Sequence, residues 1–296
     1  MMKKKILTIV VTFNRLNLLK KCIKNILIQE YKCDILIVDN CSIDGTEKYI
    51  NKIYGNNERI IYYKTEKNLG GAGGFNIGIR FALEHNYDFV WLMDDDCIPL
   101  KNTLKCFIDY DAQSIGKYGF LSSKVLWKDN SICKMNIQRK NMYINVKNFN
   151  DDVVKITMAS FVSLFIPINI IKDVGLPIKE FFLWTDDWEY TRRISLKYNC
   201  FLLNKSIVLH ETDNNIGANI VNTTEKKLNR FKYLYRNDVY LYRREGIGGY
   251  LYELIRVFIH IIKVMVFSKS KKIERIKIII ISTWKGMFFH PPIEKK

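Results

Sequence analysis

Three consecutive aspartates, Asp94, Asp95 and Asp96, directly follow the hydrophobic run FVWLM. Carboxylates this close repel one another unless a cation lies among them. Their hard oxygen atoms suit Mg²⁺ or Mn²⁺, and Mg²⁺ commonly completes its shell with substrate phosphates and water. Because alternate residues of an extended segment point the same way, Asp94 and Asp96 could bind one metal while Asp95 turns elsewhere. The alternative is a solvated acidic turn before Pro99.

A second carboxylate cluster lies in the segment WTDDWEY. It contains Asp186, Asp187 and Glu189, and Trp184 and Trp188 flank the two aspartates. Aromatic neighbours desolvate a carboxylate and offer stacking faces for sugar rings. A carboxylate whose pKa is raised by such surroundings can take a proton from an attacking hydroxyl. In the alternative interpretation, these acids only complement the dipole at a helix N-terminus.

Glycines dominate the segment NLGGAGGFNIG, residues 68–78, which suggests phosphate binding through backbone N–H groups at the start of a helix. The segment matches neither the dinucleotide fingerprint nor the P-loop. The sixth position counted from Gly71 is Asn76, and no Gly-Lys-Ser/Thr follows. The glycines could instead serve a tight turn and close helix packing.

Two further polar residues end strand-like runs. Asp39 closes DILIVD, where it could accept hydrogen bonds from a base or a ribose, and the nearby Asp44 is expected to cap a helix. His210 follows SIVL. A lone histidine is more often structural than a ligand, but His210 is a candidate third metal ligand.

The elements that position these residues alternate between strands and helices over the first hundred residues. Continuous β-branched runs predict strands buried on both faces, and apolar residues at helical spacing predict helices. The expected strands are 5–13, 34–40, 58–64 and 88–96, and helices are expected at 15–29, at 44–54 and, after a leading loop, within 70–86. This order predicts a Rossmann-like, mostly parallel α/β sheet, in which ligands bind at the carboxyl ends of the strands. Thr12, Asp39 and the three aspartates should therefore converge on one crevice.

The pattern loosens after about residue 105. Strand candidates are 117–127 and 157–167, a strand end or loop leads into a helix at 181–199, and one or two short strands are expected at 201–211. From residue 222 on, arginines and lysines are interleaved with aromatic residues. We therefore expect a domain of residues 1–221 and a helical, basic and aromatic extension of residues 222–296.

The extension contains the apolar stretch 247–267, which is nearly long enough to span a bilayer. Glu253, Arg256, His260 and Lys263 lie inside it and would be costly at membrane depth. An amphipathic helix at the membrane surface or at an oligomer contact fits better. The alternative is a helical cap that buries its apolar face on the domain.

Charge and cysteine content restrict the partners and the compartment. The chain has 47 Lys and Arg against 30 Asp and Glu, a net charge of +17, which favours polyanions such as nucleic acid, an anionic membrane or phosphorylated substrates. No recognition-helix or single-strand-binding signature supports nucleic acid. The seven cysteines are scattered without a C-x-x-C pair, which predicts a reducing cytosol rather than disulfides or zinc. The basic start lacks a small-residue cleavage site, so we do not expect a signal peptide.

The ordered set of motifs resembles the family 2 glycosyltransferases, which have the A-type nucleotide-sugar fold. The matching pieces, within residues 5–211, are IVVTFNR, VDNCSIDGT, NLGGAGGFN, WLMDDDCIP, WTDDWEY and His210. The forms GGAGGFN and WLMDDD, with the aromatic and basic tail, resemble bacterial galactofuranosyl- and rhamnosyltransferases. The resemblance implies inverting transfer of a sugar from a UDP- or dTDP-sugar to a lipid-linked saccharide of a cell-surface polysaccharide.

The resemblance also implies a role for each group of residues. The nucleoside would be contacted by Thr12, Asn14, Arg15 and Asp39. The diphosphate and the donor sugar would lie near Asn68, Gly70, Gly71, Gly73, Gly74, Asp95 and Trp184. A Mn²⁺ or Mg²⁺ cofactor that bridges the diphosphate would be held by Asp94, Asp96 and His210. Asp187 would be the catalytic base, with Asp186 and Glu189 positioning the acceptor.

Lipid-linked acceptors are made at the inner face of the bacterial membrane, where anionic headgroups attract Lys and Arg. The resemblance therefore implies a cytoplasmic protein, peripheral on that face, which could also form a homo-oligomer. Two other functions stay open. A nucleotidyltransferase acting on a sugar phosphate shares the sheet and the acidic site, but TFNRLN stands where its Gly-rich basic loop is usual. An inactive glycan- or membrane-binding module is the second.

Overall fold

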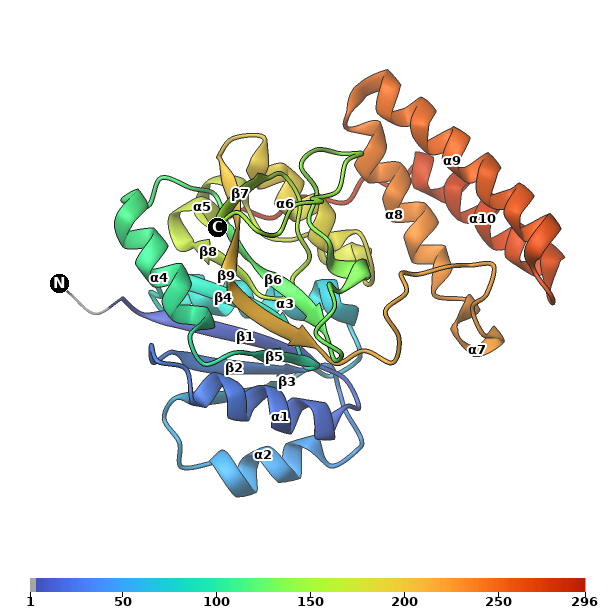
Figure 1. Cartoon of the computed structure of the whole chain (residues 1–296). Helices are drawn as coiled ribbons and strands as arrows, with labels where there is room; N and C mark the ends of the chain where they lie inside the picture. The colour runs from blue at the N-terminus through green and yellow to red at the C-terminus, as the bar shows by residue number, and fades with distance from the viewer. Residues whose placement is uncertain (1–3, 296) are drawn as a thin grey trace.

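The computed structural model describes residues 4–295, and within them nine strands form a single sheet (Figure 1). The strand order is β3-β2-β1-β4-β8-β6-β9-β5, and β7 pairs with β9. The first half consists of β1 (Ile6–Thr12), β2 (Asp34–Asp39), β3 (Ile60–Lys64) and β4 (Phe89–Asp94). These four strands are parallel, which confirms the expected Rossmann-like α/β sheet.

Helices α1 (Leu16–Leu27), α2 (Thr46–Tyr54) and α3 (Gly70–Glu84) connect the parallel strands. Alternate residues of β1 face opposite sides of the sheet, as the pleat requires. Val10 packs into the core that α1 covers, and Ile9 packs into the core that α3 covers. Both faces of the sheet are therefore buried, which explains the continuous apolar runs of these strands.

The glycine-rich segment forms the first turns of α3, where we expected a loop that leads into the helix. Gly70 has φ +72°, and a Cβ atom there would lie 1.9 Å from the carbonyl oxygen of Phe182. Further along α3, a Cβ atom on Gly78 would lie 2.4 Å from Cγ2 of Ile9. Gly70 therefore lets the turn before α6 approach the start of α3, and Gly78 lets α3 approach the sheet, more closely than any other residue would allow.

The second half of the sheet is mixed, with three short strands antiparallel to β4 and two longer strands parallel to it. Its strands are β5 (Cys97–Pro99), β6 (Leu121–Trp127), β7 (Val153–Ile156), β8 (Leu164–Pro167) and β9 (Cys200–His210). Strand β8 is antiparallel to β4 and to β6, whereas β9 is parallel to β6. β9 is one continuous strand of 11 residues, where the sequence allowed two. Its last residue, His210, pairs with Cys97 of β5, so β9 ends beside the aspartates.

Shorter helices complete this half of the domain. They are α4 (Thr103–Ser114), α5 (Ile168–Val174) and α6 (Asp186–Ser195), with the 3₁₀ turns η1 (Lys134–Asn136) and η2 (Lys179–Phe181). Helix α6 confirms the expected loop-to-helix change in the segment that contains WTDDWEY.

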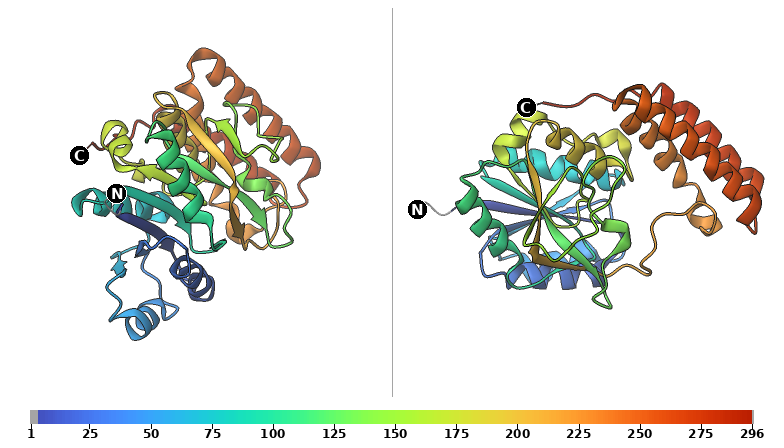
Figure 2. Two further views of the ribbon diagram at one scale, coloured as in Figure 1. Left: turned by 60° about the vertical axis from the view of Figure 1, so that its left-hand side comes forward. Right: turned by 45° about the horizontal axis from the view of Figure 1, so that its top comes forward.

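The extension is helical, with α7 (Glu225–Leu228), α8 (Phe231–Arg243), α9 (Gly246–Phe267) and α10 (Lys272–Met287). Helix α8 packs against α9 and α10, and the α9–α10 hairpin projects away from the sheet (Figure 2). The chain then returns to the domain, where Glu294 forms ion pairs with Arg80 and Lys179. None of the helices in residues 4–295 has the length and apolarity needed to cross a membrane.

Candidate active site

Strands β1 and β4 bring Thr12 next to the acidic triplet. Because β1 and β4 are neighbours in parallel register, Val11 pairs with Asp94 and both strands end at the same edge. The Thr12 hydroxyl donates a hydrogen bond of 2.7 Å to Oδ2 of Asp95. Asp95 therefore turns toward the end of β1, and the triplet lies at the carboxyl edge of the sheet, where ligands bind in folds of this type.

Asp96 lies between two basic side chains. Nη1 of Arg15 is 2.7 Å from Oδ2 of Asp96 and 3.4 Å from Oδ1 of Asp95. Nε2 of His210 is 2.9 Å from Oδ1 of Asp96, and its Nδ1 is 2.7 Å from Oδ1 of Asn136. Asp96 and His210 were both predicted as metal ligands, and the fold brings their ligand atoms together.

Ligand atoms of Asp96, Cys97 and His210 lie within 4.8 Å of one another. Burial raises the pKa of the Cys97 thiol well above its usual range, which disfavours the thiolate form that binds metals. The carboxylate and imidazole that remain suit a divalent cation such as Mn²⁺. Asp94, the other predicted ligand, is not part of this tight group but lies two residues away at the end of β4.

The electrostatics of the triplet also favour a cation. Burial, together with the charge of Asp96, raises the pKa of Asp94 to about 6 and that of Asp95 to about 7. Burial acts on Asp96 in the same direction, but the hydrogen bond and charge of His210 and the charge of Arg15 hold its pKa below its usual range. Burial lowers the pKa of His210, but its hydrogen bonds with Asp96 and Cys133 and the charges of Asp96 and Asp94 together raise it to about 10, so His210 must lose this proton before it can bind a metal. A bound divalent cation would keep all three carboxylates ionised.

Two adjoining cavities open on either side of the triplet. The first, of about 560 Å³, is lined by Arg15, Asp96 and the irregular segment that follows β9. The second, of about 420 Å³, is lined by Asp94 together with Asp186 and Asp187 of α6. Trp184 lines both cavities, so the two cavities adjoin at this residue. The two carboxylate clusters found in the sequence thus face one cavity.

Asp186 and Asp187 occupy the first turn of α6, whose N-terminal dipole favours their negative charge. Burial nevertheless raises the pKa of Asp186 to about 7. Burial and the charge of Asp186 raise the pKa of Asp187 well above its usual range. The neighbouring Trp188 stacks against Arg139, whose guanidinium carbon is 4.5 Å from the ring centroid. A carboxylate in this environment has the proton affinity of a general base.

A known protein family is similar to the first third of the chain. Residues 8–114, which include the strands that hold Thr12, Asp39 and the acidic triplet, match the model named Glycosyl transferase family 2. Residues 8–114 thus form a domain similar to the family 2 glycosyltransferases. This confirms the resemblance on which the predicted roles rest.

Curated relatives are similar to this chain over about a third of its length. The galactofuranosyltransferase GlfT1 of Mycolicibacterium smegmatis is 35% identical over 97 residues, which is 32% of this chain and 31% of the relative. The GalNAc(5)-diNAcBac-PP-undecaprenol β-1,3-glucosyltransferase of Campylobacter jejuni is 35% identical over 94 residues, 31% of this chain and 29% of the relative. The chain thus spans about a third of the length of these relatives.

Solved structures extend the likeness in fold to most of the chain. Staphylococcus aureus TarS superposes with a TM-score of 0.58 at 15% identity, over 96% of this chain and 44% of TarS. GalNAc-T7 in complex with UDP, GalNAc and Mn²⁺ superposes with a TM-score of 0.58 at 11% identity, over 86% of this chain and 55% of that protein. These comparisons confirm the A-type fold of the family 2 domain and its continuation into the helical extension.

The predicted nucleoside contacts at the other end of the crevice are held in hydrogen bonds within the protein. Asp39 is fully buried, and its carboxylate accepts hydrogen bonds from the Tyr62 hydroxyl at 2.5 Å and from the backbone N–H of Ser42 at 2.8 Å. Oδ1 of Asn14 accepts from the backbone N–H of Ile43 at 2.8 Å. These bonds join the ends of β1 and β2, so both residues shape the loops that would surround a base.

The glycines assigned to the donor have different surroundings. Gly71 lines the second cavity beside Asp94, and a Cβ atom there would meet nothing within 4 Å. Gly73 and Gly74 are buried, packed against Leu69 and Val11. In the preceding turn, Oδ1 of Asn68 accepts a hydrogen bond of 2.8 Å from the backbone N–H of Gly70. Gly71 is therefore the member of this group that faces the cavity.

Glu189, which was predicted to position the acceptor together with Asp186, does not line the cavity that Asp186 and Asp187 line. Its two carboxylate oxygens accept hydrogen bonds from Nε and Nη2 of Arg193, at 3.0 Å and 2.7 Å. Arg193 also donates to the carbonyl oxygens of Val174 and Leu176. In the structure, Glu189 anchors α6 to the chain before it, while Asp186 and Asp187 face the cavity.

Three polar residues from the extension line the second cavity and were not among the predicted site residues. They are Asp238 of α8 and Arg256 and His260 of α9. The signal was present in the sequence, because Arg256 and His260 interrupt an apolar stretch at a cost that needs an explanation. The apolar pattern alone did not show that the side chains of Arg256 and His260 point toward the domain of residues 1–221.

Proposed function

We propose that this protein is an inverting, metal-dependent glycosyltransferase that moves a sugar from a nucleoside diphosphate sugar to a saccharide acceptor. The observation that carries the proposal is the shared cavity, in which Asp94 faces Asp186 and Asp187. The metal-binding group of Asp96 and His210 lies beside this cavity. One end of the site thus suits a diphosphate and the other suits a hydroxyl that must lose a proton.

In the proposed reaction, Asp96 and His210, with Asp94, would hold the divalent cation, which offsets the charge that develops on the departing diphosphate. Asp187 accepts the proton of an acceptor hydroxyl. The hydroxyl oxygen forms a bond to the anomeric carbon as the bond from that carbon to the phosphate oxygen breaks. Attack comes from the face opposite the leaving group, so a single displacement inverts the configuration and needs no nucleophilic Ser or Cys.

The relatives support a choice of donor and acceptor. GlfT1 is named a galactofuranosyltransferase, and solved structures of TarS contain UDP or UDP-GlcNAc. We therefore favour UDP-galactofuranose as the donor, with dTDP-rhamnose as the second choice. The Campylobacter relative is named for an undecaprenol-linked glycan, which favours a lipid-linked saccharide as the acceptor.

The extension supports a site of action at an anionic membrane surface. Exposed apolar side chains cover the outer face of the α9–α10 hairpin, among them Leu251, Ile255, Phe258, Ile262, Val266, Ile273, Ile280, Trp284 and Phe288. Exposed lysines at the same hairpin are Lys263, Lys269, Lys271, Lys272, Lys277 and Lys285. An apolar face bordered by positive charge suits an anionic bilayer, which buries the apolar residues and attracts the lysines. We propose that the protein works as a peripheral protein on the inner face of the cell membrane.

A panel of nucleotide sugars tests the proposed reaction. Purified protein is incubated with each donor, a lipid-linked saccharide and either Mn²⁺ or EDTA, and the released nucleotide and the product are identified. We expect UDP or dTDP to be released only with Mn²⁺ and only from the correct donor, with inversion at the anomeric carbon. Release of pyrophosphate from a nucleoside triphosphate would favour a nucleotidyltransferase instead. Absence of release from every donor would contradict the proposal.

A further inference from the structure

The turn that leads into α6 has an unfavourable backbone conformation. Three of its residues have positive φ angles without being glycine: Phe182 at 64°, Trp184 at 64° and Thr185 at 66°. For Thr185 this conformation is especially rare, because its side chain is branched at Cβ. Each such residue costs of the order of 1–3 kcal/mol and persists only when its surroundings hold it in place. The next residues along the chain are Asp186 and Asp187.

Helix α8 holds this turn through two side chains. The side-chain amide of Asn237, which is fully buried, donates hydrogen bonds to the carbonyl oxygens of Phe181, Leu183 and Trp184, at 3.0, 3.1 and 2.9 Å. The Thr185 hydroxyl donates a hydrogen bond of 2.5 Å to Oδ1 of Asp238. Carbonyl groups that the turn leaves without regular partners are thereby satisfied.

Helix α9 holds Asp238 in turn. Nη2 of Arg256 forms an ion pair with Oδ2 of Asp238, and the same guanidinium donates to both oxygens of Glu253, at 2.7 and 2.8 Å. Glu253 is fully buried. A chain of contacts, which we name the α6–α9 connection, thus runs from Thr185 through Asp238 and Arg256 to Glu253.

The placement of these charges is unusual for a helix that only covers a domain. Such a helix normally turns its apolar residues inward and its charges to solvent. Here Arg256 of α9 faces α8 and the cavity and Glu253 is buried beside it, while Ile255 and Phe258 are exposed. Burying an ion pair costs desolvation and rarely adds stability over an apolar contact. A role at the candidate active site therefore explains the buried ion pairs of Arg256 better than a contribution to stability does.

We propose that Asn237, Asp238 and Arg256 are positioning residues for the catalytic turn. They hold the strained turn in the one conformation that places Asp187 against the acceptor hydroxyl. The inference rests on the proposed function of Asp187, which it deepens by making the α9–α10 hairpin part of the machinery for acceptor attack. Binding of UDP, which the proposal assigns to the metal site and to residues of β1, β2, α3 and β4, does not depend on this connection, whereas Trp184 in the turn is assigned to the donor sugar.

The test uses full-length protein with Asp238→Asn or Arg256→Gln, and Arg256→Lys as the conservative variant. We expect kcat for transfer to fall about tenfold to a hundredfold in Asp238→Asn and Arg256→Gln, because a small displacement of a reacting group has effects of this size. The Kd for UDP in the presence of Mn²⁺, from calorimetry, should stay within about twofold of wild type. Arg256→Lys should recover part of the lost kcat.

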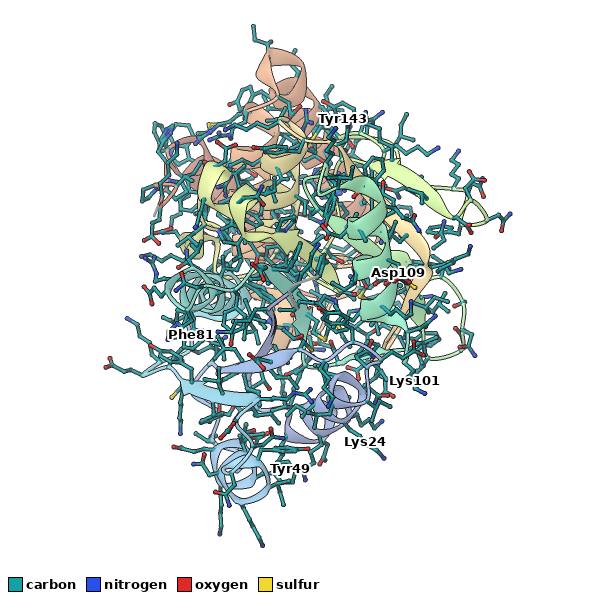
Figure 3. The ribbon with its side chains drawn as sticks, turned by 90° about the vertical axis from the view of Figure 1, so that its left-hand side faces the viewer. Lys24, Tyr49, Phe81, Lys101, Asp109 and Tyr143 are labelled. Carbon is teal, nitrogen blue, oxygen red and sulfur yellow. The ribbon has the colours of Figure 1, made fainter. Side chains whose placement is uncertain are left out.

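Two matched variants serve as controls. Asp109→Asn makes the same change on the exposed surface of α4, where Figure 3 labels Asp109, and Lys117→Gln removes an exposed positive charge from the segment after α4. Both should keep wild-type kcat with a soluble acceptor. Wild-type kcat in Asp238→Asn and Arg256→Gln would overturn the inference. A parallel loss of UDP binding would also overturn it, because it would indicate a general loss of structure.

A second measurement is independent of catalysis. Hydrogen–deuterium exchange of residues 182–187 should be faster in Arg256→Gln than in wild type, while exchange of β1 and β4 should be unchanged. Unchanged exchange at the turn would contradict the α6–α9 connection. If wild-type protein transfers no sugar, the proposed function fails, and this measurement still decides whether the connection holds the turn.

Discussion

Asp96 and Asp187 act at opposite ends of the proposed reaction, so single substitutions should separate their roles. Asp96 contacts both Arg15 and His210, and its loss removes a metal ligand. We expect Asp96→Ala to abolish transfer and to weaken metal-dependent UDP binding at least tenfold. Asp187→Asn should lower kcat by about 10²–10⁴-fold, the usual contribution of a general base, with UDP binding unchanged.

Steady-state kinetics and calorimetry with Mn²⁺ check both expectations. Glu189→Gln provides a comparison within the same helix, because its carboxylate pairs with Arg193 rather than facing the cavity. That variant should lose stability more than chemistry, with kcat close to wild type in the folded fraction. Near-full turnover in Asp187→Asn would remove Asp187 from the role of base.

The proposed base also fixes the sign of the pH dependence. Asp187 must be ionised to take a proton, and burial with the charge of Asp186 raises its pKa well above the usual range. Transfer should therefore be slow at low pH, rise as Asp187 loses its proton, and level off above its pKa. The other charged groups that line its cavity are Asp94, Asp186, Asp238, Arg139 and Arg256.

The pH profile of kcat, measured from about pH 5 to 9 at saturating Mn²⁺, tests this prediction. The rising limb should be absent from the residual activity of Asp187→Asn, because the amide does not titrate. A wild-type rate that is flat down to pH 5 would mean that the base has an ordinary carboxyl pKa or that another step limits turnover.

At the scale of the elements, α3 is placed against β1 by glycine. A Cβ atom on Gly78 would lie 2.4 Å from Cγ2 of Ile9, in a core with no free space. Gly78→Ala should therefore destabilise the protein by about 1–3 kcal/mol, the usual cost of overpacking, although alanine favours a helix by up to about 1 kcal/mol. Urea unfolding measures the difference. Gly248→Ala in α9, where a Cβ atom meets nothing within 4 Å, should be neutral or stabilising.

Hydrophobic periodicity predicted the elements whose signal lies within one segment of the chain. It did not predict arrangements that depend on contacts between segments far apart in the sequence. The runs of β1, β2 and β4 and the spacing of α1 identify a parallel core, because each signal lies within one segment. The pairing of β8 with β4 in the antiparallel direction depends on segments far apart in the chain, and nothing in either run encodes it. The same limit hid the helical start of α3, since glycines at close contacts resemble a flexible loop.

The candidate site likewise contains residues that local sequence signals predict and residues that only distant contacts bring to the site. Strand ends such as Thr12 and Asp96 could be predicted to converge because parallel strands share an edge. His210 was harder, since its place beside Asp96 depends on β9 reaching β5. Asp238 of α8 and Arg256 of α9 could not be assigned to the site from the sequence. The apolar residues of α9 suggest an apolar face toward the domain, whereas the ion pair between Asp238 and Arg256 turns these charges toward the protein interior.

The whole molecule has an apolar surface at one end and a polar cavity behind it. The outer face of the α9–α10 hairpin, which includes Phe258 and Trp284 at 63% and 60% exposure, should bind anionic vesicles. Replacing both residues by glutamate should abolish that binding, because it removes apolar area and adds charge of the wrong sign. Ile115→Glu, at an apolar residue after α4 that is 80% exposed, should bind as wild type does.

Sedimentation with vesicles of phosphatidylglycerol, and with neutral phosphatidylcholine vesicles for comparison, measures the effect, and the oligomeric state is measured in parallel by light scattering. Binding should require the anionic lipid and weaken with salt, since the lysines act through screened charge. If the double glutamate variant still sediments with vesicles, the hairpin is not the membrane contact. If wild-type protein forms a dimer that this variant loses, a second copy of the chain covers the apolar face.

In the bilayer arrangement, Arg256 lies between the lipid-facing residues and Asp238, so an acceptor anchored in the membrane would reach Asp187 along the wall that α9 provides.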